Sequence, residues 1–463
     1  MTDTVSRILN IKKEELPLAV LSAVYFFCIL CGYFFLRPVR DAMGVARGMD
    51  ELRWLFVCTA LVSLAVVLAF GGVVARTHRR RFIPIGYLFV IGCLIVFAGM
   101  RIVDGAAGGG LIGSDTETPL ARYVGYVYYV WLSTINLFVN SVFWAFMVDL
   151  FDVRQGKRIF AFIGIGGTLG AIAGGWATNV ISGMTDSVYL PAGLMLIGAA
   201  FFGLAIVVML SLDRLVFGSQ RSLTADGAAI EGHQRAGDRD VAGEGGIGGT
   251  FWEGAQAVVR SPYLLGIGAY IALMAISNTL IYFTQANIIL DDRDTFSELI
   301  AGFAQLDVFA QGATLFVQIF VTTQVIKRIG VGWTLVILPV VPMLGFAVLS
   351  AWATFGVMAV FQAVHRATRY AISRPARETL FSVVSPSEKY KAKPFVDVFV
   401  YRGGDLAGAG VDSMFAAMGL TLAAVAAATV PVAGVWAVLC LALGRAQQAK
   451  DTGSPVSEPP EVG

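Results

Sequence analysis

Long runs of apolar residues without a charge recur along the chain. Because a helix rises about 1.5 Å per residue, about 20 apolar residues can cross the roughly 30 Å hydrocarbon core of a bilayer. Six such runs occur in the first half, and two more open the second half. They cover residues 16–36, 54–75, 82–100, 123–148, 159–184, 187–212, 261–290 and 299–326. The pattern predicts a membrane-spanning helix at each of them.

Two later apolar runs are too long to be single spans. A helix over residues 329–364 would reach about 54 Å, so we expect a turn near residues 350–354. The same arithmetic divides residues 396–443 near Gly419. Each run then supplies two spans, and the total becomes twelve, as six plus six. The predicted fold is an all-α membrane protein with twelve transmembrane helices.

A polar stretch separates the two sets of spans. Residues 213–250 are rich in Gly, Asp, Glu and Arg, and such a composition buries too little apolar surface to order itself. We therefore predict a six-helix bundle over residues 1–212, a disordered cytoplasmic linker over 213–250, a second six-helix bundle over 251–444 and a cytoplasmic tail over 445–463.

The basic residues predict the orientation, because Lys and Arg resist translocation across a membrane. With the N-terminus in the cytoplasm, the cytoplasmic segments hold 24 of the 34 Lys and Arg residues, and the opposite side holds seven. Both termini are therefore expected in the cytoplasm. The first run is too long for the apolar part of a cleaved signal peptide, so we expect it to be retained.

The composition excludes several classes of function. Apolar residues make up 57% of the chain and charged residues only 14%, against about 25% charged in soluble domains. A net charge of +2 does not favour a nucleic-acid polymer as partner. The three histidines have no metal-binding spacing, and no Walker or dinucleotide fingerprint is complete. We expect no enzyme activity, no metal and no cofactor, and nothing in the sequence requires more than a monomer.

The two halves are similar to each other. Gly166-Gly-Thr-Leu169 lies 237 residues before Gly403-Gly-Asp-Leu406, in equivalent spans. Such a parallel repeat resembles the major facilitator superfamily. The loop between the second and third spans resembles that superfamily's signature loop through Gly71, Arg76, Arg80 and Arg81, and we expect a gating role for these arginines. Gly166, Gly170 and Gly174 form a row of small residues that favours close helix packing over ligand contact.

Charges at membrane depth are costly and usually mark a function. Arg402, Asp405 and Asp412 share one face of the eleventh span, because they are three and seven residues apart. Arg366 and Arg369 are neighbours on the tenth span beside His365, and Asp307 lies in the eighth. A guanidinium can hold carboxylate or phosphate through two parallel hydrogen bonds, so this set suits an anion.

Each of these charges also has a structural interpretation. Arg402 and Asp405 are spaced to neutralise each other, and Asp307 can carry a proton, pair with a cation or bond to a neighbouring helix. Arg37, Arg40 and Asp41 follow the first span beside Pro38. They either extend that helix, with Arg40 lining the substrate cavity, or anchor it in the headgroups.

Three stretches resemble bacterial members of the ATP:ADP antiporter (nucleotide exchange) family, which belongs to the major-facilitator-like transporters. They are Tyr33–Gly44, the motif from Phe143 to Asp149 with Gly156–Phe160, and the stretch from Pro375 through Tyr390–Lys393 to Asp405. The resemblance implies a carrier in a bacterial inner membrane. It also implies functional roles for Arg40, Arg402, Asp149 and Asp307. The family has lysines where Arg40 and Arg402 stand, and Asp405 is an addition, so the substrate need not be ATP or ADP.

The expected function is secondary active transport by alternating access, in which an anionic nucleotide or another phosphorylated solute is exchanged or imported. The alternatives are proton-coupled transport of another organic solute, and a membrane scaffold or receptor without flux. The expected partners are the lipid bilayer and a small anion such as ATP, ADP or another nucleotide. The expected substrate-binding residues are Arg40, Arg366, Arg369 and Arg402, and the expected coupling residues are Asp149, Asp307, Asp405 and Asp412.

Overall fold

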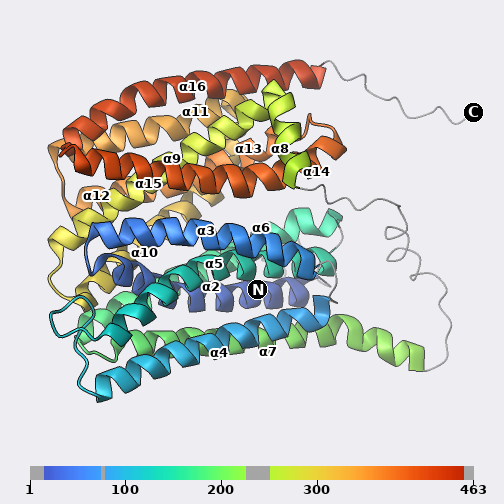
Figure 1. Cartoon of the computed structure of the whole chain (residues 1–463). Coiled ribbons are helices and arrows are strands. Elements are labelled where there is room, and N and C mark those ends of the chain that lie inside the picture. Colours follow the sequence, from blue (N-terminus) through green and yellow to red (C-terminus); the bar gives the residue numbers. More distant parts are fainter. Residues whose placement is uncertain (1–14, 75–78, 152, 226–250, 453–463) are drawn as a thin grey trace, which may run out of the picture. The chain divides into compact units, whose positions relative to one another are not determined.

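The computed structural model describes the chain apart from residues 1–14, 75–78, 152, 226–250 and 453–463. At some helical positions, among them residues 79–82 and 149, only the backbone is described. All regular elements in the described part are helices (Figure 1). The first six are α2 (Leu16–Val45), α3 (Met49–Val74), α4 (Arg79–Ala106), α5 (Pro119–Leu150), α6 (Val153–Met184) and α7 (Leu190–Ala225).

The later part of the chain is broken into more pieces. Long helices are α9 (Pro262–Asp292), α10 (Phe296–Phe320), α11 (Thr322–Ala351) and α16 (Leu422–Thr452). Two further helical paths contain π-helical segments. The first runs through α12 (Phe355–Ala367), η1 (Thr368–Ser373) and α13 (Arg374–Leu380), and the second through α14 (Pro386–Pro394), η2 (Phe395–Val400) and α15 (Tyr401–Ala417). A short amphipathic helix, α8 (Phe251–Arg260), precedes α9.

Both long apolar runs turn where the sequence predicts. α11 ends at Ala351, and α12 begins after Thr354, whose side chain accepts a hydrogen bond from the N–H of Val357. α15 and α16 are separated at Gly419, whose φ of 62° suits a residue without a side chain. Two helices extend beyond the predicted apolar runs: α2 continues through Pro38 to Val45, and α7 continues to Ala225.

Nine helices in the described part of the chain are long and apolar enough to cross a membrane. Three of the predicted spans do not appear as such a helix. The span over residues 54–75 lies in α3, whose side chains beyond residue 67 are not described. In the tenth predicted span, the π-helical segment η1 separates α12 from α13. In the eleventh, the π-helical segment η2 precedes α15, which has only 17 residues.

The chain divides into two compact units. The first unit comprises Met1–Gly246 and Ile289–Val308, and the second comprises Ile247–Ile288 and Phe309–Gly463. In the first unit α2 is central and packs against α5, α6 and α7, while α4 lies along α7. In the second unit α11 lies along α16 (Figure 1).

Small residues bring α6 directly against the backbone of α2. A Cβ added at Gly166, Gly170 or Gly174 would collide with a carbonyl oxygen of α2, at Ala23, Phe27 and Cys31 respectively. The predicted packing role of this glycine row is confirmed. The close approach excludes larger side chains and lets two long helices share an extended contact.

Gly170→Ala is therefore expected to lower the free energy of unfolding of the detergent-solubilised protein by about 1 to 3 kcal/mol, because α2 and α6 must separate. Gly183→Ala on the same helix is the control, since no heavy atom lies within 4 Å of its added Cβ. That control should be neutral or slightly stabilising. Equal thermal unfolding midpoints for both variants would mean that the α2–α6 contact is not tight at Gly170.

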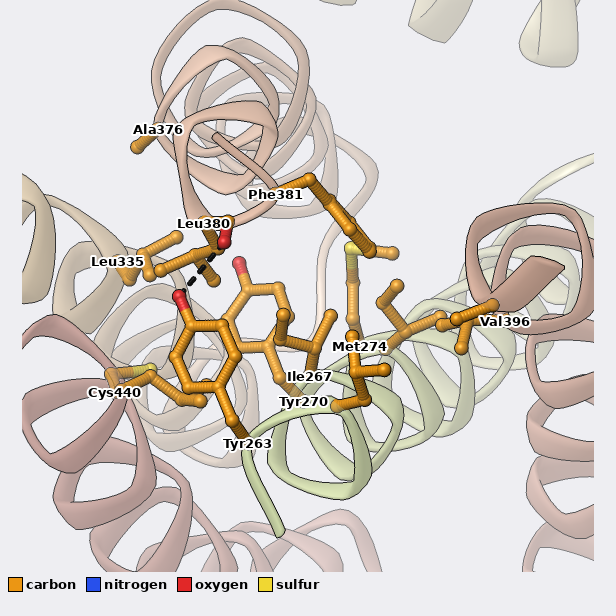
Figure 2. Packing of buried hydrophobic residues seen from close by; sticks show 14 of the residues in the cluster. Tyr263, Ile267, Tyr270, Met274, Leu335, Ala376, Leu380, Phe381, Val396 and Cys440 are labelled. Atoms are coloured by element: carbon orange, nitrogen blue, oxygen red, sulfur yellow. Dashed lines mark hydrogen bonds between the residues drawn. The ribbon is translucent and has the colours of Figure 1, made fainter. Parts of the chain in front are cut away.

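The core of the second unit forms where α9 meets α11, α13 and α16. Figure 2 shows Tyr263 of α9 donating its hydroxyl to the carbonyl oxygen of Leu380, at 2.8 Å. Around this bond lie buried apolar side chains from all four helices, including Ile267, Met274, Leu335, Leu380 and Cys440. This packing fixes α13, and with it the end of the helical path that carries Arg366 and Arg369.

Candidate functional site

Arg369 lies in the π-helical segment η1 and is held by neutral groups. Its Nη1 donates to Oδ1 of Asn278 on α9 at 2.5 Å, and its Nη2 donates to the hydroxyl of Tyr401 at 2.6 Å. The guanidinium carbon lies 5.1 Å from the ring centroid of Tyr370 and 5.6 Å from that of Tyr401. These contacts fix the plane of the guanidinium without neutralising its charge.

No ion pair to Arg369 exists among the described residues. Arg369 is partly buried, and a guanidinium withdrawn from water normally needs an opposite charge, a cavity or a ligand. Asn278 and Tyr401 supply only dipoles, so the positive charge remains able to attract an anion.

Arg402 has a different environment. Its Nη1 lies 3.0 Å from Oδ2 of Asp405, one helical turn further along α15. Oδ1 of Asp405 accepts a hydrogen bond from the hydroxyl of Thr279 on α9, at 3.3 Å. The internal pair that the sequence allows is thus formed, although 16% of the Arg402 side chain remains exposed.

Both π-helical segments adjoin these arginines. η1 contains Arg369, and η2 ends immediately before Tyr401 and Arg402. π-Helical turns are rare and occur often at functional sites, because they change the direction of side chains relative to a regular helix. The hydrogen bond between Arg369 and Tyr401 joins the two helical paths at this point.

Other predicted residues of the tenth span are buried beside Arg369. His365 is 1% exposed and packs edge-on against the ring of Phe361, and Arg366 is 9% exposed. Gln362, one turn earlier, donates to Oε1 of Gln285 on α9. This bond and the one between Arg369 and Asn278 tie α9 to the α12–η1 path at two levels.

The charges after the first span are buried in the first unit. Arg37 Nη1 lies 3.0 Å from Oδ1 of Asp307, which is 2% exposed, and Arg37 Nε lies 3.7 Å from Asp41. Arg40 pairs with Asp41 at 2.5 Å and donates to the hydroxyl of Ser133 at 3.2 Å. These buried contacts do not fit an anchor that reaches the headgroups. Asp307 thus pairs with a cation, the guanidinium of Arg37.

The remaining predicted residues are only partly described. Asp412 is half-buried on α15. Asp149 lies next to the last residue of α5, and Arg80 and Arg81 lie in the first turn of α4, but their side chains are outside the described part. Arg76 lies outside the described residues altogether.

Sequence reasoning missed several residues that hold the arginines. Asn278, Thr279 and Tyr401 contact Arg369 or Asp405 across two helices, and Arg37 pairs with Asp307. An amide such as Asn278 in an otherwise apolar run is a usable signal, because an amide at membrane depth needs a partner. Tyr401 carries no such signal, since tyrosine is common in apolar helices.

Known proteins resemble the chain in sequence over most of its length. Two relatives are both described as ADP,ATP carrier protein 1. The one from Chlamydia pneumoniae is 22% identical over 448 residues, covering 86% of this chain and 83% of the relative. The one from Chlamydia trachomatis is 20% identical over 450 residues, covering 86% and 80%.

Solved structures resemble the fold. A mutant of the nucleoside transporter NupG is 15% identical and matches with a TM-score of 0.59 over 94% of this chain and 99% of its own. A POT family transporter in complex with 5-aminolevulinic acid is 11% identical and matches with a TM-score of 0.60 over 92% and 96%. At such identities the likeness concerns the fold alone, which is that of major-facilitator-type transporters.

A family model covers the centre of the chain. Residues 118–356, a little over half of the sequence, match the model described as TLC ATP/ADP transporter. This match agrees with the carrier relatives and with the apolar helices of an integral membrane protein. The expected resemblance is confirmed: the chain is a membrane transporter and belongs to the TLC ATP/ADP transporter family.

Proposed function

We propose that the protein is a secondary active transporter that exchanges or imports an anionic nucleotide, or another phosphorylated solute, by alternating access. The carrier relatives support this class of cargo. The observation that carries the proposal is the environment of Arg369, whose guanidinium is fixed by Asn278 and Tyr401 and has no ion-pair partner among the described residues. Such a group binds phosphate through two parallel hydrogen bonds.

The local charge balance favours an anion. Arg369 and Arg402 lie on two neighbouring helical paths of the second unit, and Asp405 is bonded to Arg402. These three residues have a formal net charge of +1. We propose that Arg366, Arg369 and Arg402 bind the cargo and that Arg40 in the first unit is a further cargo-binding residue. A cation or a neutral solute would leave the net positive charge of Arg369, Arg402 and Asp405 uncompensated.

The proposed architecture is twelve spans in two six-helix pseudo-repeats. Each unit contains a similar glycine contact, since Gly166 and Gly170 approach α2 while Gly404 and Gly408 approach α9. Each unit also bonds its first span to its fourth, through Arg40 to Ser133 and through Gln285 to Gln362. These parallels support the bundles over residues 1–212 and 251–444, with the linker 213–250 and the tail 445–463.

We further propose a bacterial inner-membrane location with both termini in the cytoplasm, as the distribution of basic residues indicates. Arg76, Arg80 and Arg81 would then lie in a cytoplasmic gating loop.

Asp149, Asp307, Asp405 and Asp412 are the proposed coupling residues. A positive site without its anion is costly to move through a low-dielectric environment, and this cost favours exchange over one-way movement.

Binding of a nucleotide should raise the thermal unfolding midpoint of the purified full-length protein. At 100 times the dissociation constant, a ligand adds about 2.7 kcal/mol to the free energy of unfolding. We expect this stabilisation with adenosine triphosphate or diphosphate and little with adenosine, which lacks phosphate. Stabilisation by adenosine alone would contradict an anion site, and stabilisation by neither nucleotide would remove nucleotides from the cargo class.

A further inference from the structure

Asp405 stands apart from the other charged groups of the candidate site, because it is an acidic residue in a place where anion binding is proposed. Its Oδ2 lies 3.0 Å from Arg402 Nη1, and its Oδ1 accepts from Thr279. Asp405 is 3% exposed. It is therefore a buried carboxylate held by Arg402 and Thr279.

Close helix packing holds Asp405 in this place. A Cβ added at Gly404 would lie 2.9 Å from the carbonyl oxygen of Ala272, and one added at Gly408 would lie 3.0 Å from that of Ile276. α15 thus approaches α9 closely on both sides of Asp405 along the helix. The carboxylate is buried at this contact, whereas the longer Arg402 side chain starts from the same helix and remains partly exposed.

Arg369 and Arg402 therefore provide different electrostatic environments for an anion. Arg369 has neutral partners only, so an incoming phosphate meets no competitor there. At Arg402 the phosphate must compete with Asp405 and experiences its repulsion. Together Arg369, Arg402 and Asp405 carry a net charge of +1. Repulsion from a fixed charge grows with each negative charge on the ligand, so Asp405 penalises highly charged anions most.

We propose that Asp405 is a built-in counter-ion that sets which charge state of phosphorylated cargo the carrier prefers, by opposing the more highly charged members of a series. The inference rests on the proposed function, because it concerns the same anion site. It assigns to Asp405 a role in specificity. Coupling by Asp405, as proposed above, would concern the translocation step instead.

The test uses a charge series with one constant base: adenosine mono-, di- and triphosphate. Dissociation constants are measured for the full-length wild type and for Asp405→Asn, which keeps the shape of the side chain and removes its charge. We expect the ratio of the dissociation constant for adenosine monophosphate to that for adenosine triphosphate to rise roughly tenfold in Asp405→Asn, because the triphosphate gains more affinity than the monophosphate. Asp405→Glu keeps the charge and should leave the ratio as in the wild type.

Asn278→Asp provides the opposite change. Asn278 already accepts a hydrogen bond from Arg369, so a carboxylate of the same shape fits there and adds one negative charge. The ratio should fall roughly tenfold. Should Asp405→Asn not fold alone, it is introduced into Asn278→Asp, where it should raise the ratio by the same factor.

The outcomes separate the two proposals. Binding of none of the three nucleotides by the wild type contradicts nucleotides as the cargo of the proposed function. If the nucleotides bind but the ratio for Asp405→Asn equals that of the wild type, the inference is wrong while the proposed function stands. The same conclusion follows if the ratio for the double variant equals that for Asn278→Asp. In that case Asp405 only holds α15 against α9, through the hydrogen bond that it accepts from Thr279.

Discussion

Arg369→Gln is expected to reduce nucleotide uptake into proteoliposomes by at least about 100-fold. Hydrogen bonds to a charged group contribute about 1.5 to 3 kcal/mol each. The substitution removes the two hydrogen bonds with which a guanidinium can hold one phosphate. Glutamine keeps a neutral polar side chain at this position while the charge is gone, and its shorter amide ends before the positions of the Nη atoms that bond to Asn278 and Tyr401. The measurement is the initial rate of labelled nucleotide uptake at equal amounts of reconstituted protein.

Two further variants show whether this loss is specific. Arg369→Lys keeps the charge but not the planar fork, and it should retain part of the activity. Arg53→Gln removes a guanidinium that pairs with the exposed Asp50, and it should transport like the wild type. Unchanged uptake by Arg369→Gln would remove Arg369 from the substrate site.

Glu117→Ala is expected to destabilise the protein by about 3 to 5 kcal/mol, because it leaves Arg47 buried without its carboxylate. Arg47 Nε donates to Oε2 of Glu117 at 2.9 Å, a second bond joins Nη2 to Oε1, and both side chains are 3% exposed. Arg47 also donates to the carbonyl oxygen of Met43 and lies 4.9 Å from the ring centroid of Tyr126. The pair ties the segment before α5 to the end of α2.

Thermal unfolding in detergent measures this effect, and a double variant identifies its origin. Arg47→Leu combined with Glu117→Leu removes both charges and should recover most of the stability, since no unpaired ion remains buried. Asp50→Asn is the exposed counterpart, because the side chain of Asp50 is 95% exposed, and it should cost less than about 1 kcal/mol. Equal losses for Glu117→Ala and Asp50→Asn would contradict a buried role for the Arg47–Glu117 pair.

The fold was largely predictable because a membrane constrains a sequence strongly. Run length alone predicts the turns near residues 350–354 and at Gly419, and α12 and α16 begin just beyond them. The spacing of Gly166, Gly170 and Gly174 predicts one packed face, which α2 covers. Helix ends were less predictable, since α2 and α7 continue into residues that are polar yet compatible with a helix.

The partners of the charged residues were harder to predict. Helical periodicity shows that Arg402 and Asp405 can meet, because both lie on one helix. It cannot show that Asn278 meets Arg369 or that Arg37 meets Asp307, since these contacts depend on how separate helices pack. The π-helical segments add to the difficulty, because they shift side-chain directions without a signal in the sequence pattern.

The most direct test of the account is nucleotide uptake by the reconstituted wild type, in vesicles loaded with either unlabelled nucleotide or buffer alone. We expect labelled nucleotide to enter much faster when nucleotide is inside, and adenosine not to enter through the protein. Uptake that needs no internal nucleotide and follows an imposed pH gradient would support proton-coupled transport instead. Uptake of adenosine at the rate of the nucleotide would contradict an anion carrier, and no uptake at all would contradict a nucleotide carrier.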